Sequence, residues 1–154
     1  MTNRDPVEVA VALFDQDYAC SQALLLAYAS RLGIDRSTAA RIAAPFAAGM
    51  GCLGRTCGAV TGALMVLGLH GGPESPNDQE TKERLYEMVR AFIVRFQERH
   101  GTVVCNELVG HDISTPEGLE QARAEGVFDR RCPGLVRDAA EIVGNILGPD
   151  GQTV

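Results

Sequence analysis

The feature that most constrains the fold of this sequence is the helical spacing of its apolar residues, which is clearest between residues 77 and 100. The apolar residues of this segment recur every three or four positions, at Leu85, Met88, Val89, Phe92, Ile93 and Phe96. Side chains at this spacing share one face of an α-helix, whereas a half-buried strand places them at alternate positions. No segment of the chain alternates in this way. The sequence therefore predicts an all-α fold.

Start and stop signals for helices divide the chain into a bundle of about six or seven helices. Prolines and capping side chains stand where the periodic segments begin, and glycines stand where they end. Proline at position 45 should kink the helix that contains it, because it removes one backbone hydrogen bond. The predicted helices cover residues 6–14, 18–31, 38–48, 57–69, 78–100 and 132–147, with shorter ones at 103–109 and 116–124.

The length and charge of the chain predict one domain and exclude some partners. Because domains of about 100–150 residues are the commonest, we expect a single domain over residues 1–154, with flexible termini at 1–5 and 148–154. A net charge of −6 argues against a nucleic-acid partner or an anionic membrane surface, since both require basic patches. The longest apolar stretch, residues 57–69, is too short to span a membrane. Without a visible export signal, we expect a cytoplasmic protein.

The five cysteines are the residues most suggestive of chemistry. A reducing compartment keeps thiols free, so they are not expected to form a structural disulfide framework. Four of them fall in the first turn of a predicted helix, where free N–H groups and the helix dipole stabilise a thiolate and lower its pKa. These four are Cys20, Cys57, Cys105 and Cys132, whereas Cys52 lies in the glycine-rich segment 49–56.

The helix that starts at Cys57 carries small residues at helical spacing. Gly58 and Gly62 lie four residues apart, and Ala59 begins an adjoining stripe. Small side chains at this spacing allow another backbone, or a bound group, to approach closely. Both interpretations stay open, a tight crossing of two helices and a surface that binds a cofactor.

The order of these residues resembles a known family. Cys20, the segment Cys57-Gly-Ala-Val-Thr-Gly62, Cys105 and Cys132 together resemble the C_GCAxxG_C_C family of redox-active proteins over nearly the whole chain. The resemblance implies that the four cysteines act together in one helical domain, with Gly58, Ala59 and Gly62 completing the motif. Related domains are fused to haem-bearing cytochromes, which favours a role in electron transfer with a redox partner protein.

Three hypotheses about function follow. In the first, Cys20, Cys57, Cys105 and Cys132 bind an iron–sulfur cluster, in the first instance [2Fe–2S], or a zinc ion in an all-thiolate site. In the second, Cys57 is a redox thiol of a thiol–disulfide protein, with Cys52 as its resolving partner. In the third, the cysteines only pack, and the helix over residues 77–100 forms the seam of a homodimer. The first two require the sulfurs to gather at one end of the bundle, with Cys52 at the margin.

Overall fold

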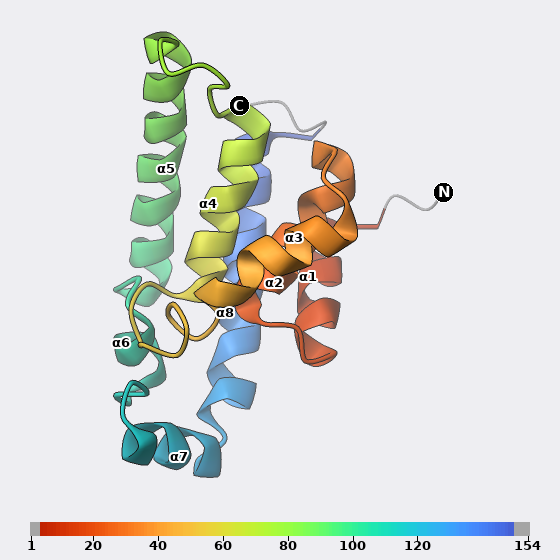
Figure 1. Cartoon of the computed structure of the whole chain (residues 1–154). Coiled ribbons are helices and arrows are strands. Elements are labelled where there is room, and N and C mark those ends of the chain that lie inside the picture. The colour runs from red at the N-terminus through yellow and green to blue at the C-terminus, as the bar shows by residue number, and fades with distance from the viewer. Residues whose placement is uncertain (1–3, 150–154) are drawn as a thin grey trace.

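The computed structural model describes residues 4–149, and this part of the chain is all-α, as predicted (Figure 1). It contains eight α-helices and no β-strand within the described residues, with a single isolated bridge between Thr56 and Val104. The α-helices are α1 (Pro6–Asp15), α2 (Cys20–Ala29), α3 (Arg36–Ala43), α4 (Gly58–Gly71), α5 (Gln79–His100), α6 (Cys105–Val109), α7 (Pro116–Ala124) and α8 (Val127–Leu147), and two short 3-10 turns follow α2 and α3 at Ser30–Leu32 and Ala44–Phe46.

The helix ends follow the capping chemistry of the sequence in several places. The side chain of Asp78 accepts a hydrogen bond from the backbone N–H of Thr81 and so caps α5. The same helix ends at Gly101, whose φ of 81° is readily adopted only by glycine. Thr115 caps α7 in the same manner, through the N–H of Gly118. These boundaries agree with the sequence prediction.

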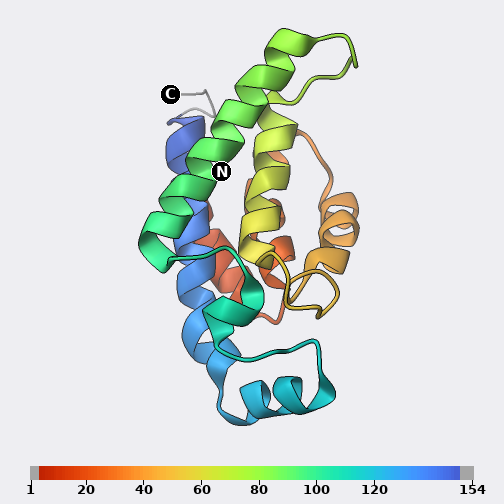
Figure 2. The same cartoon turned by 90° about the vertical axis from the view of Figure 1, so that its left-hand side faces the viewer.

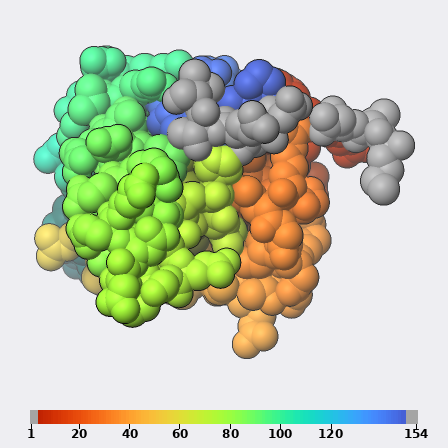
Figure 3. Space-filling model, turned by 90° about the horizontal axis from the view of Figure 1, so that it is seen from above, coloured from red at the N-terminus to blue at the C-terminus, as the bar shows by residue number. Residues whose placement is uncertain are grey.

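The bundle is organised around α2, α4 and α8. Helix α2 packs on α1, α3 and α4, while α8 packs on α1, α4 and α5. Viewed from one end, α4 lies between α5 and the segment that contains α2 and α3 (Figure 3). At the other end, α6 and α7 extend below the bundle and pack on the first turns of α8 (Figure 2). The molecule is therefore a helical bundle with a small helical cap.

The buried apolar residues form two separate clusters. The larger one fills the bundle and includes Phe92 and Phe96, both fully buried. The smaller one, here called the cap core, consists of Cys105, Val109, Ile113, Ala122 and Val127. The cap core is built from α6, α7, the loop between them and the start of α8, so this end of the molecule has its own apolar centre.

Several predicted helix boundaries were wrong. Helices α2 and α6 begin at Cys20 and Cys105, each two residues later than predicted. Helix α3 begins at Arg36 rather than at residue 38, because Asp35 caps it, and the chain passes into a 3-10 turn at Ala44 just before Pro45. Helix α8 begins at Val127 after Gly126, not at Cys132, and Pro133 lies inside it. A proline within a helix costs one hydrogen bond, and here the packing of α8 across the bundle outweighs that cost.

The ends of the described chain are held by specific contacts. Asp5 caps α1 by accepting a hydrogen bond from the N–H of Val7, and Gly148 terminates α8. Of the termini that the sequence predicts to be flexible, residues 1–3 and 150–154 lie outside the described residues. Within residues 4–149, none of the helices combines the length and the apolar character that crossing a membrane requires.

Candidate functional site

All five cysteines line one pocket, which lies where the cap meets the bundle. The pocket has a volume of about 250 Å³ and is called the cysteine pocket below. Its sulfur-bearing residues are Cys20, Cys52, Cys57, Cys105 and Cys132, and its other walls come from Phe14, Ala19, Ala47, Ala48, Gly58, Leu108, Val109, Leu119, Arg123, Phe128 and Leu135. Among the described residues that line it, Arg123 has the one charged side chain. The structure thus brings widely separated thiols together in an apolar environment.

The pocket straddles the boundary between the two apolar clusters. Cys57 belongs to the bundle core and Cys20 packs against it. Cys105 belongs to the cap core, and Cys52 and Cys132 pack against that cluster. None of the five forms a disulfide. Any group bound by sulfurs from both sides would therefore connect the bundle to its cap.

Cys20 and Gly58 meet where the N-terminal ends of α2 and α4 converge. Cys20 is the first residue of α2, and its sulfur occupies the space that a side chain at Gly58 would need. A Cβ atom at Gly58 would also lie 3.1 Å from the carbonyl oxygen of Phe46 and 3.2 Å from the backbone nitrogen of Ser21. The glycine of the Cys57-Gly58 pair is therefore required so that the Cys20 sulfur can lie directly against α4.

Cys57 and Cys105 are joined through the short antiparallel bridge of Thr56 with Val104. The N–H of Cys57 donates to the carbonyl of Val103 at 2.8 Å, and the N–H of Cys105 donates to the carbonyl of Arg55 at 2.6 Å. In such a pair, residues on either side of the bridged position project to the same face. The bridge therefore holds Cys57 and Cys105 as diagonal neighbours whose side chains project to the same face, where the pocket lies. Neither the bridge nor this placement was predicted from the sequence.

Cys132 does not lie in the first turn of a helix, which corrects the sequence prediction. It is the sixth residue of α8 and reaches the pocket from the side of the helix rather than from its end. Cys20 and Cys105 do begin their helices, and Cys57 is the residue just before α4. The dipole of α8 consequently contributes less to the Cys132 sulfur than the other helices contribute to theirs, because the effect fades beyond the first turn.

Burial determines the protonation of the thiols. It raises the pKa of Cys20 and Cys57, and it raises the pKa of Cys105 and of Cys132 to about 12. The expected lowering by helix N-termini exists, since backbone N–H groups of Ser21 and Gly58 favour the Cys20 thiolate, but desolvation exceeds it. Negative charge on one sulfur further raises the pKa of its neighbours, as Cys20 does for Cys57. The folded protein therefore does not lower the pKa of these four thiols.

Cys52 lies on an uncommon stretch of backbone. Residues 48–52 all have positive φ, between 52° and 71°, and form what we call the left-handed turn. Three of these residues, Ala48, Met50 and Cys52, carry side chains, and each pays about 1–2 kcal/mol for this conformation. The turn is fastened to α6, because the N–H of Asn106 donates to the carbonyl of Gly54 at 3.1 Å. Sequence reasoning identified a glycine-rich loop here, but not the left-handed turn.

The motif residues of α4 divide between two roles. Gly58 lines the cysteine pocket, whereas Ala59 and Gly62 do not. Gly62 packs on α2, where an added Cβ atom would lie 2.7 Å from the carbonyl oxygen of Ser21 and 2.8 Å from the Cβ of Leu24. Ala59 is fully buried in the bundle core. The structure thus assigns Gly62 to a tight helix crossing and leaves Gly58 as the motif residue beside the sulfurs.

The donor set of the pocket matches soft metal chemistry, although the sulfurs are not drawn together into a coordination sphere. Within residues 4–149, no three His, Cys, Asp or Glu side chains converge closely enough to form a ready metal-binding group. Thiolates are nevertheless the ligands of iron–sulfur clusters and of all-cysteine zinc sites, and an apolar wall is usual around such groups. The residues present therefore fit a thiolate-bound group, provided that their side chains rotate inward to contact it.

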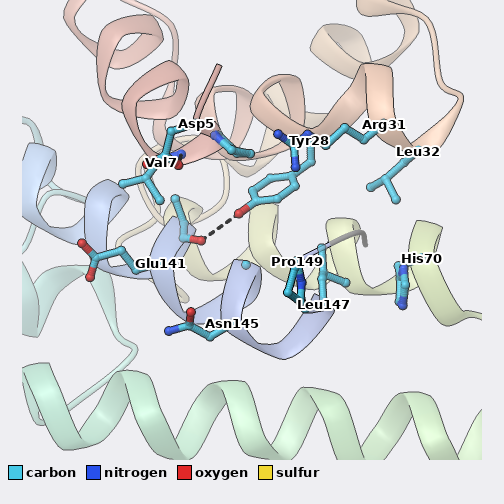
Figure 4. A pocket seen from close by; sticks show the side chains of 14 residues that line it. Asp5, Val7, Tyr28, Arg31, Leu32, His70, Glu141, Asn145, Leu147 and Pro149 are labelled. Atoms are coloured by element: carbon cyan, nitrogen blue, oxygen red, sulfur yellow. Dashed lines mark hydrogen bonds between the residues drawn. The ribbon is translucent and has the colours of Figure 1, made fainter. Parts of the chain in front are cut away.

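A second, larger pocket opens at the opposite end of the bundle, near the end of α8 (Figure 4). It has a volume of about 710 Å³, and Tyr28, Arg31, His70 and Asn145 are among the residues that line it. The Tyr28 hydroxyl donates a 2.9 Å hydrogen bond to the carbonyl of Ala140 and so ties α2 to α8. Because no cysteine lines this pocket, it is separate from the sulfur site.

Comparison with known proteins gives one match. The family described as "Putative redox-active protein (C_GCAxxG_C_C)" matches residues 18–146, which include all five cysteines. The family's name spells its motif Gly-Cys-Ala-x-x-Gly, whereas this chain has Cys57-Gly58-Ala59 followed by Val, Thr and Gly62. No curated protein and no solved structure matches the chain. Because the match covers most of the sequence, the chain belongs to the C_GCAxxG_C_C family of redox-active proteins.

Proposed function

We propose that this protein transfers electrons through an iron–sulfur cluster, in the first instance [2Fe–2S], held by Cys20, Cys57, Cys105 and Cys132. The observation that supports the proposal is the shared pocket, to which α2, α4, α6 and α8 or their caps each contribute one of these sulfurs. When bound, such a cluster supplies one-electron redox chemistry. A physiological redox partner and a cytoplasmic location, where thiols stay reduced, belong to the same proposal.

The electrostatics of the pocket favour a bound cation or cluster over free thiolates. Each sulfur that ionises makes ionisation of its neighbours harder, as seen for Cys105 and Cys132, whose pKa values are both raised by the charge of Cys20. A positively charged iron centre removes this repulsion, because the negative charges then share one counter-charge. Affinity of the site for metal should for this reason rise with pH.

The backbone around the sulfurs suits a cluster as well. N–H groups of Ser21 and Gly58 interact with the Cys20 sulfur, and those of Ala59 and Val60 interact with the Cys57 sulfur. Hydrogen bonds to ligand sulfurs stabilise the more negative, reduced state of a cluster and raise its reduction potential. The N–H groups at the helix starts would thus adjust the reduction potential of the cluster rather than lower the pKa of a nucleophilic thiol.

The thiol–disulfide alternative with Cys57 as nucleophile receives less support. Cys57 is only 5% exposed, and burial raises its pKa, so it would be a slow nucleophile at neutral pH. Its resolving partner in that hypothesis, Cys52, is not among the thiols whose charge affects Cys57, which are Cys20 and Cys105. The structural alternative, in which the cysteines only pack, does not account for sulfurs from two apolar clusters meeting in one pocket.

Anaerobic purification tests the proposal directly. We expect about two iron and two acid-labile sulfide per chain, with visible charge-transfer absorption. Single Cys→Ser substitutions at the four proposed ligand positions should each reduce the bound iron severely. Cys52→Ser is the matched control, since it removes a thiol from the same pocket and should leave the iron content unchanged. About one zinc per chain without sulfide would indicate a zinc site instead of a cluster. Folded protein that takes up neither metal would refute the proposal.

A further inference from the structure

Cys52 is the one pocket cysteine to which the proposed cluster assigns no role, and its surroundings provide one. It is half-buried, and its sulfur lies 3.9 Å from the carbonyl oxygen of Ile113 in the cap core. Cys105 lies in the same pocket and the same core, and the two sulfurs are close enough for their charges to interact. Cys20, whose charge affects the Cys105 pKa more than that of Cys52 does, packs on the bundle core, so Cys52 is the one of the two that shares the cap core with Cys105.

The left-handed turn that carries Cys52 packs against Cys105. Residues three apart on a helical turn lie on the same face, and Gly49 and Cys52 are three apart within the run of positive φ. Gly49 faces Cys105 so closely that an added Cβ atom would lie 2.8 Å from the Cys105 Cβ. Cys52 belongs to the same turn, and its sulfur lies beside Ile113, which shares the cap core with Cys105.

Cys57 is less suited than Cys52 to bond with Cys105. Cys57 and Cys105 are diagonal neighbours across the Thr56–Val104 bridge, and such neighbours have Cα atoms about 7–8 Å apart, whereas disulfides usually need about 4.4–6.8 Å. The bridge hydrogen bonds hold that spacing. Cys52 lies outside the described helices and is not held by that bridge, so its approach to Cys105 requires a change in the turn alone.

We infer that Cys52 and Cys105 form a reversible disulfide that closes the cysteine pocket when the chain meets a low-molecular-weight disulfide such as oxidised glutathione. The half-buried Cys52 sulfur attacks one sulfur of the small disulfide, forms a mixed disulfide and releases one small thiol, which takes the Cys52 proton. The Cys105 thiol, which is as buried as Cys57, then attacks the Cys52 sulfur slowly, but within the same molecule, and releases the second small thiol with the second proton. The protein loses two electrons and two protons, which the small disulfide gains.

The disulfide itself does not depend on the proposed cluster, but its consequence does. Cys105 is one of the four proposed ligands, so a bond to Cys52 leaves three sulfurs and blocks assembly of the cluster. Reduction of the bond restores the ligand set. Cys52 would then be a regulatory thiol that makes cluster loading depend on the cellular thiol–disulfide balance.

Tryptic mapping tests the disulfide, because cleavage after Lys and Arg leaves each cysteine on its own peptide. The metal-free, reduced protein is treated with oxidised glutathione, the remaining thiols are alkylated, and the digest is analysed by mass spectrometry without reduction. We expect residues 42–55 linked to 100–123 as the principal pair. A principal link from 56–82 to 100–123, or from 5–31 to 56–82, would overturn the inference, as would recovery of Cys52 in the alkylated form.

Iron uptake separates this inference from the proposed function. Oxidised wild-type protein should take up no cluster until it is reduced, whereas Cys52→Ser, treated in the same way, should load as the reduced protein does. Cys132→Ser serves as the control for the bond and should still give the 42–55 to 100–123 link. If the reduced wild-type protein never binds iron but the link forms, the proposed cluster fails and the disulfide stands. If the reduced protein loads but the link is absent, the disulfide fails and the cluster stands.

Discussion

The crossing of α2 and α4 provides the sharpest test of the packing, because two glycines of one helix have opposite surroundings. At Gly62 an added methyl group would meet the carbonyl oxygen of Ser21 at 2.7 Å and its Cα at 3.1 Å. At Gly68, six residues further along α4, nothing lies within 4 Å of the added atom. Gly62→Ala and Gly68→Ala are therefore the same chemical change in the same helix, one in a closed crossing and one in open space.

The expected free energies follow from two opposing effects. Replacing glycine by alanine inside a helix stabilises it by about 1 kcal/mol. Overpacking costs about 1–3 kcal/mol, and the upper end applies at Gly62 because the atoms that must move belong to the backbone of α2. Gly62→Ala should therefore destabilise the protein by about 2 kcal/mol, and Gly68→Ala should stabilise it by about 1 kcal/mol.

Thermal and urea unfolding of the reduced, metal-free variants measures the difference. For a chain of this size, 1 kcal/mol shifts Tm by about 2–4 °C, so Gly62→Ala should lower Tm by about 4–8 °C and Gly68→Ala should raise it by about 2–4 °C. The urea m-value should stay unchanged in both variants. Equal stabilities for the two variants would show that α2 and α4 do not cross at Gly62 as described.

Three further predictions concern hydrogen bonds and charge. Tyr28→Phe should lower the free energy of unfolding by about 1 kcal/mol, because the hydrogen bond from the hydroxyl to the buried carbonyl of Ala140 is lost; an unchanged urea midpoint would contradict this. Asp78→Ala should cost about 1 kcal/mol in the same assay through loss of the α5 cap, and Asp78→Asn should retain most of it. Folding raises the thiol pKa of Cys105 and Cys132 to about 12, so the stability that these thiols contribute to the reduced, metal-free protein should be fully present below about pH 8.5 and fall as the pH rises toward 12. At pH 8, iodoacetamide should alkylate these two thiols slowly until urea unfolds the chain.

The fold class could be predicted from the sequence because local signals determine it. The apolar period of α5, the Asp78 cap and the stop at Gly101 all agree with the structure, since each depends on residues close together in the chain. The start of α8 could not be found in this way. Pro133 looks like the first residue of a helix, but packing across the bundle continues the helix on both sides of it.

The sequence pointed to the cysteines as the residues of the candidate site, but it did not predict the burial or the backbone geometry around them. Helix starts indicated correctly that Cys20 and Cys105 lie in the first turns of their helices, but not how deeply the sulfurs are buried, which depends on distant walls such as Phe14 and Phe128. The sign of the pKa shifts was wrong for that reason. The left-handed turn has no local sequence signal beyond its glycines, because side-chain residues such as Met50 adopt positive φ only under tertiary constraint.

The division of the apolar interior into two clusters has a consequence for how the pocket is filled. The cap core is small, and α6, with only five residues, adds little stability of its own, so the cap should open by subglobal unfolding while the bundle stays folded. Such an opening separates Cys105 from Cys20 and Cys57. If the proposed cluster is held here, its binding and the ordering of residues 105–128 would become one event. Hydrogen exchange would show this as protection gained in the cap, and not in α4, when the group is bound.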